Sequence, residues 1–377
     1  MIVAAAGSGK TRLIINDVIE NPKKRILITT FTLANEQSIR RRLVKANRGV
    51  IPENVNIQPW FSFLLEHGVR PYRFWDERVY GMKFVSTPLE TGVRYIEKID
   101  GKDVPVIWSE NGNFNKHYFT NDMKVYSDKL SKLVTRCNKK SSGSVIKRLE
   151  NIYERIYIDE VQDMAGYDLE IIKLLLKSKI HITMVGDPRQ TVYQTHHERK
   201  HEKYAYGKIK EFILTIPQKK KTICVIDEET LQDSYRNSES ICALSSKLYA
   251  EYNVCRSLSK KTHSHTGIFF VQKKDIDSYG KMISPLQLRL NRNRTASLST
   301  PVMNFGESKG LEEEHVLIYP TDYMLEWLNS AKIKLEPKTK SQLYIALTRA
   351  FFSVGIVVED TFVKKTNEIQ IWNPDEK

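Results

Sequence analysis

The sequence has few of the residues that mark linkers, disulfide frameworks or membrane spans. Only 13 prolines and 17 glycines occur in 377 residues, too few for a chain built mainly of linkers or disordered segments. The four cysteines form no C-x-x-C pair, which argues against a zinc ribbon or a disulfide framework and fits a reducing cytoplasm. No run of about 18 apolar residues is present, so neither a transmembrane helix nor a membrane partner is expected. The N-terminal MIVAAAGSGK also lacks the basic and apolar regions of a signal peptide.

Positive charge, by contrast, is in excess. Lysine and arginine number 59 against 45 aspartates and glutamates, a net charge of +14. Such an excess suits a polyanionic partner such as nucleic acid, although a basic, well-solvated surface would explain it equally well. The basic residues are spread along the chain, which favours a groove built from several segments over a single basic arm.

Apolar β-branched runs alternate with helical periodicities along most of the chain. Strands are predicted at 1–5, 25–30, 55–57, 156–158, 180–185, 222–226, 268–271, 316–318 and 354–358, and helices at 11–20, 35–45, 169–175, 238–249 and 343–352. Residues 80–149 differ, because they are polar and lysine-rich and end in the sequence SSGS. The pattern predicts an α/β protein with two lobes, each a parallel sheet with helices on both faces, and a small inserted subdomain.

A glycine-rich turn lies between the first strand and the first helix. The sequence AAAGSGKT at Ala4–Thr11 fits the P-loop pattern, with an alanine in place of the first glycine. Its glycines allow backbone N–H groups to turn toward phosphate oxygens at the positive end of the following helix. The predicted nucleotide-binding residues are Ala6, Gly7, Ser8, Gly9, Lys10 and Thr11. Lys10 would neutralise phosphate charge and Thr11 would ligate magnesium; a chance glycine turn is the alternative.

Two acidic residues follow the apolar strand at 156–158. Asp159 stands at the carboxyl end of this strand, where parallel sheets bind ligands. It is predicted to hold Mg²⁺, and Glu160 to activate the attacking water. Taken alone, the pair would be better explained as a helix cap, but the phosphate loop upstream favours hydrolysis.

Further motifs resemble those of superfamily 1 helicases of the UvrD/Rep/PcrA type. The segments IDEVQD (158–163) and VGDPRQTVY (185–193) resemble motifs II and III of this family. The other matches, in family order, are TFT (30–32), PWFSF (59–63), SYRNS (234–238), ESKGLE (307–312) and YIALTRA (344–350). Since they span nearly the whole chain in the expected order, the resemblance is specific.

The resemblance implies a motor with two RecA-like lobes and ATP in the cleft between them. The first lobe would comprise 1–79 and 150–220, the inserted subdomain 80–149, and the second lobe 221–377 with a reduced insertion at about 250–302. Gln190 would sense the γ-phosphate or position water, and Arg236 and Arg349 would act as arginine fingers. The remaining nucleotide contacts implied are Arg12, Tyr235, Gly310 and Glu312. Core packing of Tyr235 and a surface salt bridge at Arg236 are the alternatives.

The resemblance also implies contacts with single-stranded or partly duplex DNA and 3′→5′ movement. The residues at the corresponding positions are Thr30, Phe31, Trp60, Ser62 and Tyr193. Aromatic faces stack on bases of any sequence, at about 1–3 kcal/mol each. Ordinary core packing is the competing interpretation of each aromatic residue.

Two of the departures from the family pattern bear on the predicted function. Only Met1, Ile2 and Val3 precede the phosphate loop in this sequence, so the Q-motif that the resemblance would place upstream to read adenine is not expected. ATP is the favoured nucleotide and GTP is the alternative. The second departure is the short insertion at 250–302. It allows a second hypothesis, in which a DNA-stimulated ATPase acts as a switch and regulates or loads a partner, such as a nuclease, without unwinding DNA. A damaged motor that only binds DNA is disfavoured, because the predicted catalytic residues are intact.

Three histidines, His196, His197 and His201, invite a metal-binding interpretation. No carboxylate or cysteine completes a recognisable ligand pattern beside them, and the region is rich in lysine. A solvated or phosphate-facing role is therefore favoured over a metal site.

Overall fold

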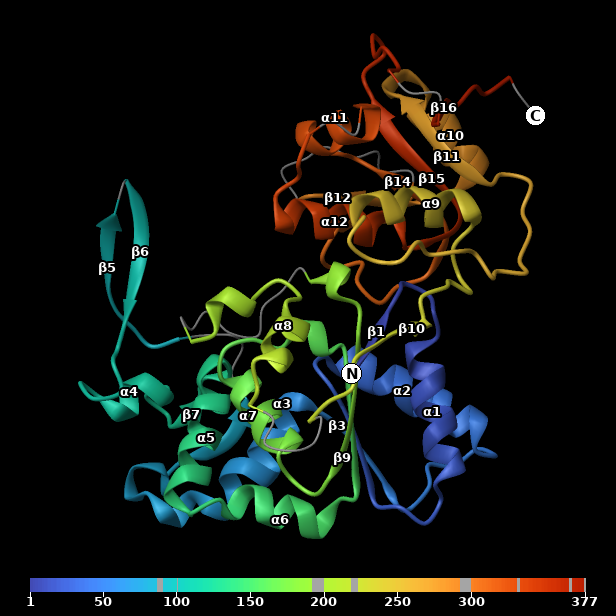
Figure 1. The fold of residues 1–377 in the computed structure, drawn as a ribbon. Coiled ribbons are helices and arrows are strands. Elements are labelled where there is room, and N and C mark those ends of the chain that lie inside the picture. The colour runs from blue at the N-terminus through green and yellow to red at the C-terminus, as the bar shows by residue number, and fades with distance from the viewer. Residues whose placement is uncertain are drawn as a thin grey trace. The chain divides into compact units, whose positions relative to one another are not determined.

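A computed structural model describes residues 1–86, 91–99, 101–191, 200–217, 223–291, 300–330, 333–365 and 368–375 (Figure 1). The chain divides into two compact units. Unit 1 comprises Met1, Thr11–Val185 and Gln194–Ile226, and unit 2 comprises Ile2–Lys10, Gly186–Tyr193 and Asp227–Lys377. In these described ranges, no helix combines the length and the apolar character needed to cross a membrane.

The first sheet has six strands. Its order is β10 (Asp227–Leu231), β1 (Ile2–Ala4), β9 (His181–Gly186), β8 (Arg155–Asp159), β2 (Ile26–Thr30) and β3 (Val55–Pro59). Strand β2 pairs in parallel with β3 and β8, and Ile28 lies opposite Ile57 on one side and Tyr157 on the other. Every residue of β2 is buried, as expected for a parallel strand that is covered on both faces.

Unit 1, which holds β2, β3, β8 and most of β9, also contains helices and a small ribbon. The helices are α1 (Lys10–Glu20), which starts at the unit boundary, α2 (Leu33–Ala46), α3 (Trp60–Phe63), α4 (Phe114–Tyr118), α5 (Leu130–Lys140), α6 (Ser144–Ile152), α7 (Tyr167–Leu176) and α8 (Ile209–Leu214). Two short strands pair, β4 (Lys83–Ser86) and β7 (Lys124–Val125), and an antiparallel ribbon joins β5 (Val93–Ile99) and β6 (Lys102–Ile107). The ribbon extends away from the helices of its own unit, and all of β5 is exposed (Figure 1).

The second sheet lies entirely in unit 2. Its order is β13 (Val302–Asn304), β12 (Leu286–Arg289), β14 (Glu313–Ile318), β15 (Ala350–Val358), β11 (Gly267–Gln272) and β16 (Gln370–Ile371). The helices of this unit are α9 (Glu239–Leu248), α10 (Ile276–Ile283), α11 (Asp322–Ser330) and α12 (Pro337–Leu347).

Successive residues of β15 point to opposite faces of the second sheet. Val354 and Ile356 join the core formed with α9, α11 and α12, whereas Val357 joins the core around Tyr279 of α10. Because side chains alternate along a strand, both faces of this sheet are covered by helices. The predicted α/β class, with two parallel-stranded sheets, is confirmed.

Two predicted elements are wrong in their placement. The strand predicted at 222–226 is not formed over the described residues 223–226; it begins at Asp227 instead. The helix predicted at 343–352 starts earlier and ends at Leu347, where Thr348 donates its backbone N–H to the carbonyl oxygen of Tyr344. Residues Ala350–Val358 then form β15, because the Phe-Phe-Ser-Val run packs better in the sheet than on a continued helix.

Candidate functional site

The phosphate loop has the backbone that its glycines predict. Strand β1 ends at Ala4, helix α1 starts at Lys10, and between them Gly7 and Gly9 adopt φ values of +71° and +95°. L-residues rarely adopt such positive φ values, so glycine is the natural residue at both positions. Ser8 closes the turn, since both its backbone N–H and its hydroxyl donate to the carbonyl oxygen of Ala5.

Motif IV packs directly against this loop within unit 2. Tyr235 donates its backbone N–H to the carbonyl oxygen of Gly7 at 3.0 Å. A Cβ atom on Gly7 would lie 2.5 Å from Cβ of Arg236 and 2.6 Å from the hydroxyl oxygen of Ser234, closer than real contacts allow. Gly7 is therefore required both for the turn and for the close approach of motif IV. The Tyr235 ring itself is about half exposed, at 48%.

The two predicted arginine fingers contact the motif V segment. Arg236 forms an ion pair with Glu312. Arg349, which is 1% exposed, donates to the carbonyl oxygen of Leu311 at 3.1 Å and to the side-chain oxygen of Gln190 at 3.2 Å. Gly310 precedes these contacts with a φ of +90°. Unit 2 thus brings Gln190 of motif III into contact with Arg349 of motif VI. In the same unit, Arg236 of motif IV and Glu312 of motif V are paired with each other.

The acidic pair of unit 1 sits at the end of a buried strand. Asp159 is 3% exposed and its carboxylate accepts the backbone N–H of Glu160 at 3.0 Å. Glu160 adopts the left-handed φ of +55°, which is uncommon for a non-glycine residue. Its carboxylate accepts a hydrogen bond from the Gln162 side chain. The backbone thus holds two carboxylates at the carboxyl end of β8, with Glu160 less buried than Asp159.

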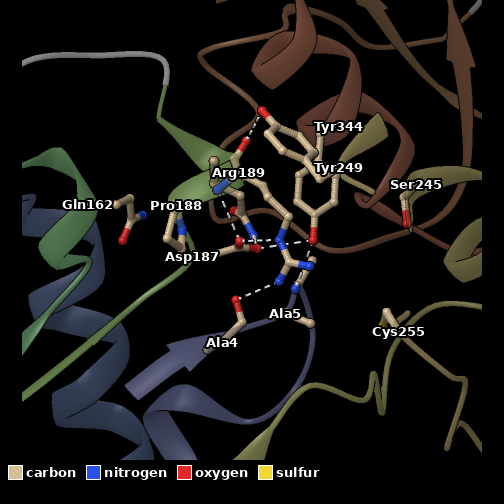
Figure 2. Close-up of polar contacts among 12 residues, drawn as sticks. Ala4, Ala5, Gln162, Asp187, Pro188, Arg189, Ser245, Tyr249, Cys255 and Tyr344 are labelled. Atoms are coloured by element: carbon tan, nitrogen blue, oxygen red, sulfur yellow. Dashed lines mark hydrogen bonds and ion pairs between the residues drawn. The ribbon is translucent and has the colours of Figure 1, made fainter. Parts of the chain in front are cut away.

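A buried polar cluster, which the sequence motifs did not single out, surrounds Asp187 in unit 2 (Figure 2). Asp187 is fully buried and pairs with Arg189 at 2.7 Å. Arg189 also donates to the carbonyl oxygen of Ala4 at 2.9 Å, and its guanidinium lies over the rings of Tyr252 and Tyr344. Burial alone would lower the pKa of Arg189, but the Asp187 carboxylate raises it above its ordinary value, so the arginine stays charged.

The signal for this cluster was present in the sequence but unassigned. Asp187, Arg189 and Tyr344 all belong to the motif III and motif VI segments that resemble the helicase family. Catalytic roles in these two segments were predicted only for Gln190 and Arg349, because a motif identifies its residues without saying which of them bond to one another.

The residues predicted to contact DNA differ in exposure. Thr30 is fully buried, Phe31 is partly exposed and Ser62 is exposed. Trp60 is 2% exposed and donates its indole N–H to the carboxylate of Asp168 at 2.7 Å. Base stacking on Trp60 would therefore require this ring to be uncovered. Tyr193 lies outside the described residues.

The remaining candidates have ordinary surroundings. Thr11 is partly exposed and Arg12 exposed on the first turn of α1. His201 contacts the carboxylate of Glu170 at 2.7 Å, while His196 and His197 lie outside the described residues. Over the part of the chain that the structure describes, no group of three or more His, Cys, Asp or Glu side chains could hold a metal ion.

Comparison with known proteins gives one matching family model and several relatives. The model of the UvrD/REP helicase N-terminal domain matches residues 103–198. A DNA helicase II homolog from Mycoplasma genitalium is 24% identical, over 52% of this chain and 34% of its own length. A DNA helicase from Mycoplasma pneumoniae is 22% identical, over 95% of this chain and 81% of its own length. The chain thus spans only about a third of the first of these relatives.

Comparison with solved structures matches the crystal structure of arterivirus nonstructural protein 10, a helicase. It matches with a TM-score of 0.47 and 13% identity, over 98% of this chain and 61% of the viral chain. The range that the family model matches, 103–198, contains the motifs at 158–163 and 185–193. The resemblance of this chain to superfamily 1 DNA helicases of the UvrD type is confirmed.

Proposed function

We propose that the chain hydrolyses ATP and couples hydrolysis to 3′→5′ movement along single-stranded DNA, separating duplex strands ahead of it. The observation that carries the proposal is the bond between Arg349 and Gln190, at 3.2 Å, in the same unit as the phosphate loop. An arginine and a glutamine that are predicted to act on the γ-phosphate are thereby held together. The names of the Mycoplasma relatives add support.

Each predicted catalytic residue has a defined task in this proposal. The phosphate-loop amides and Lys10 bind the phosphates, and Gly7 and Gly9 supply the backbone geometry. Glu160 accepts a proton from the attacking water, while Gln190 orients that water. Arg349 stabilises the charge that develops on the phosphate oxygens, and its planar fork can hold two of them at once.

The donor atoms at the predicted magnesium site fit a hard cation. Asp159 offers a carboxylate at the end of β8, and Thr11 offers a hydroxyl on the first turn of α1. Magnesium is usually bound by one or two such oxygen ligands together with substrate phosphates and water, so a cage of three protein ligands is not required. When bound, it would neutralise charge on the phosphate oxygens.

DNA is the polymer partner that the charge and the relatives favour. The net charge of +14 supplies salt-dependent attraction to phosphates. Phe31 and Ser62, which are at least partly exposed, are the described candidates for direct contact.

A second function has one specific observation in its favour. The described residues between 250 and 302 contribute β11 and β12 to the second sheet and α10 to its cover, so this segment builds the lobe itself. A motor with so short an insertion could act as a DNA-stimulated ATPase switch that loads a partner such as a nuclease. Unwinding of a forked duplex by the purified chain distinguishes the two functions.

The test is ATP hydrolysis by the purified chain with and without single-stranded DNA. Stimulation of at least about 10-fold by DNA is expected of a nucleic-acid-coupled motor, a change of about 1.4 kcal/mol in the barrier. Glu160→Gln keeps the shape of the side chain but cannot accept the proton, so it should abolish turnover and still bind ATP. An equal rate with and without DNA would contradict the proposed coupling, and full turnover by Glu160→Gln would contradict the assigned base.

A further inference from the structure

The hydroxyl group of Tyr344 lies between the phosphate loop and motif III. It accepts the backbone N–H of Ala6 at 3.3 Å and donates to the carboxylate of Asp187 at 3.1 Å. Tyr344 is 2% exposed on helix α12, and its ring packs edge-on against Tyr249 and under the guanidinium of Arg189 (Figure 2). A buried hydroxyl bonded on both sides has a defined position, because neither partner can exchange it for water without cost.

The chain of hydrogen bonds continues from Asp187 to the predicted arginine finger. The Oδ2 atom that accepts from Tyr344 also accepts from the side-chain nitrogen of Gln190 at 2.9 Å. This bond leaves the side-chain oxygen of Gln190 facing Arg349, which donates to it at 3.2 Å. Five groups from motifs I, III and VI are thus joined in one continuous path, all within unit 2.

We propose that Tyr344 is a positioning residue that couples the conformation of the phosphate loop to the orientation of Gln190 and Arg349. The inference rests on the proposed ATPase function. A shift of the loop at Ala6 moves the hydroxyl, and the hydroxyl moves the carboxylate that orients Gln190. A change in the conformation of the phosphate loop is thereby transmitted through hydrogen bonds to the groups that act on the γ-phosphate.

The alternative is that Tyr344 only fills the core. Burial raises the pKa of its hydroxyl well above the ordinary value, so it stays a neutral donor in either case. The neighbouring Tyr249 provides a matched control, since it is also buried and its ring packs against that of Tyr344. Its hydroxyl contacts Ser341 at 3.0 Å and donates to the carbonyl oxygen of Arg189 at 3.3 Å. The hydroxyls of Tyr344 and Tyr249 therefore differ in their partners but share their surroundings.

The experiment compares Tyr344→Phe with Tyr249→Phe in steady-state ATP hydrolysis at saturating single-stranded DNA. Tyr344→Phe keeps the ring and removes only the hydroxyl, so kcat should fall about 10-fold while KM for ATP stays within about 2-fold, as for an interaction that matters in the transition state. Tyr249→Phe should keep both constants within about 2-fold. Equal losses in the two variants, or an unchanged kcat in Tyr344→Phe, would overturn the proposal.

A double-mutant cycle with Gln190→Ala tests the path itself. If the hydroxyl acts through Gln190, Tyr344→Phe should lower kcat by less than about 2-fold in the Gln190→Ala background. Losses that simply multiply would mean that Tyr344 acts by another route and would contradict the relay.

Amide hydrogen exchange provides a readout that does not depend on activity. In Tyr344→Phe the Ala6 amide loses its acceptor, so a peptide covering the phosphate loop should exchange about 10-fold faster, whereas Tyr249→Phe should leave its exchange unchanged. If the wild type hydrolyses no ATP, the proposed function fails while this measurement still judges the contact. Unchanged exchange in Tyr344→Phe would reject the relay even in an active enzyme.

Discussion

Two acidic centres of the molecule contrast in how their charges are held. Asp159 and Glu160 end a strand of unit 1, and Glu160 occupies a left-handed backbone conformation. Asp187 of unit 2 is fully buried, paired with Arg189 and hydrogen-bonded by Tyr344 and Gln190. The first arrangement places its carboxylates at the carboxyl end of a strand, whereas the second uses its carboxylate to fix the positions of Arg189, Tyr344 and Gln190. From the sequence alone, a D-E pair and a G-D-P-R-Q segment both predict a catalytic carboxylate. Only the groups that bond to each carboxylate in the structure distinguish the two.

The largest expected effect is at Arg349. This arginine is the last group of the hydrogen-bonded path that passes through Asp187, here called the Asp187 path. Arg349→Ala should slow hydrolysis by about 10³-fold, because it removes the group predicted to stabilise the transition state. ATP turnover at saturating DNA measures it. Since Arg349 is 1% exposed, Arg349→Lys is the control that keeps the charge and most of the volume but loses the planar fork. A lysine variant with the wild-type rate would mean that charge alone suffices and would contradict a bidentate role.

One isosteric substitution at each acidic centre tests whether the two carboxylates have different roles. Asp187→Asn leaves the buried Arg189 without its counter-charge, which should lower the free energy of unfolding by about 3 kcal/mol. Asp159→Asn should cost less stability while abolishing hydrolysis. Thermal unfolding of both variants, followed beside ATP turnover, checks the contrast. Equal stability losses would mean that the two aspartates are structural to the same degree.

Replacing both members of the buried pair tests whether the unpaired charge of Arg189 causes the loss of stability. Asp187→Asn combined with Arg189→Met removes the uncompensated charge, so the double variant should regain much of the lost stability. If the double variant is no more stable than Asp187→Asn, the loss of stability does not come from the unpaired charge. It then comes from the lost hydrogen bonds of Tyr344 and Gln190 to the carboxylate.

The sequence could predict the elements more readily than the contacts. The buried runs at β2 and β8 are readily predicted, because a parallel strand covered on both faces is largely apolar. The end of α12 was misplaced since Ala350–Phe352 suits a helix or a strand equally well until the sheet is known. The phosphate-loop backbone followed from its glycines, but the Asp187 path joins residues 157 positions apart in the chain, which no local pattern can reveal.

The smallest expected effect concerns His315, a buried titratable side chain that packs among aromatic and imidazole rings. His315 of β14 contacts the Ser353 hydroxyl at 2.7 Å and packs against the rings of His263 and Phe352. Burial, assisted by nearby His263 and His265, lowers the pKa of His315 from 6.5 to about 4. Between these values the unfolded chain binds a proton that the folded chain does not, so stability is full above pH 6.5 and falls as the pH is lowered toward 4.

This pH dependence distinguishes the effect of burial on His315 from the effect of charge pairing on Arg189. His315 stays neutral because burial disfavours its cation, whereas Arg189 stays charged because Asp187 faces it. Thermal unfolding should therefore move to lower temperature between pH 7 and pH 5. His315→Gln can still bond to Ser353 but cannot titrate, so its loss over the same interval should be smaller. If both chains lose the same amount, the acid sensitivity belongs to other groups, and the neutral state of His315 contributes nothing measurable to stability.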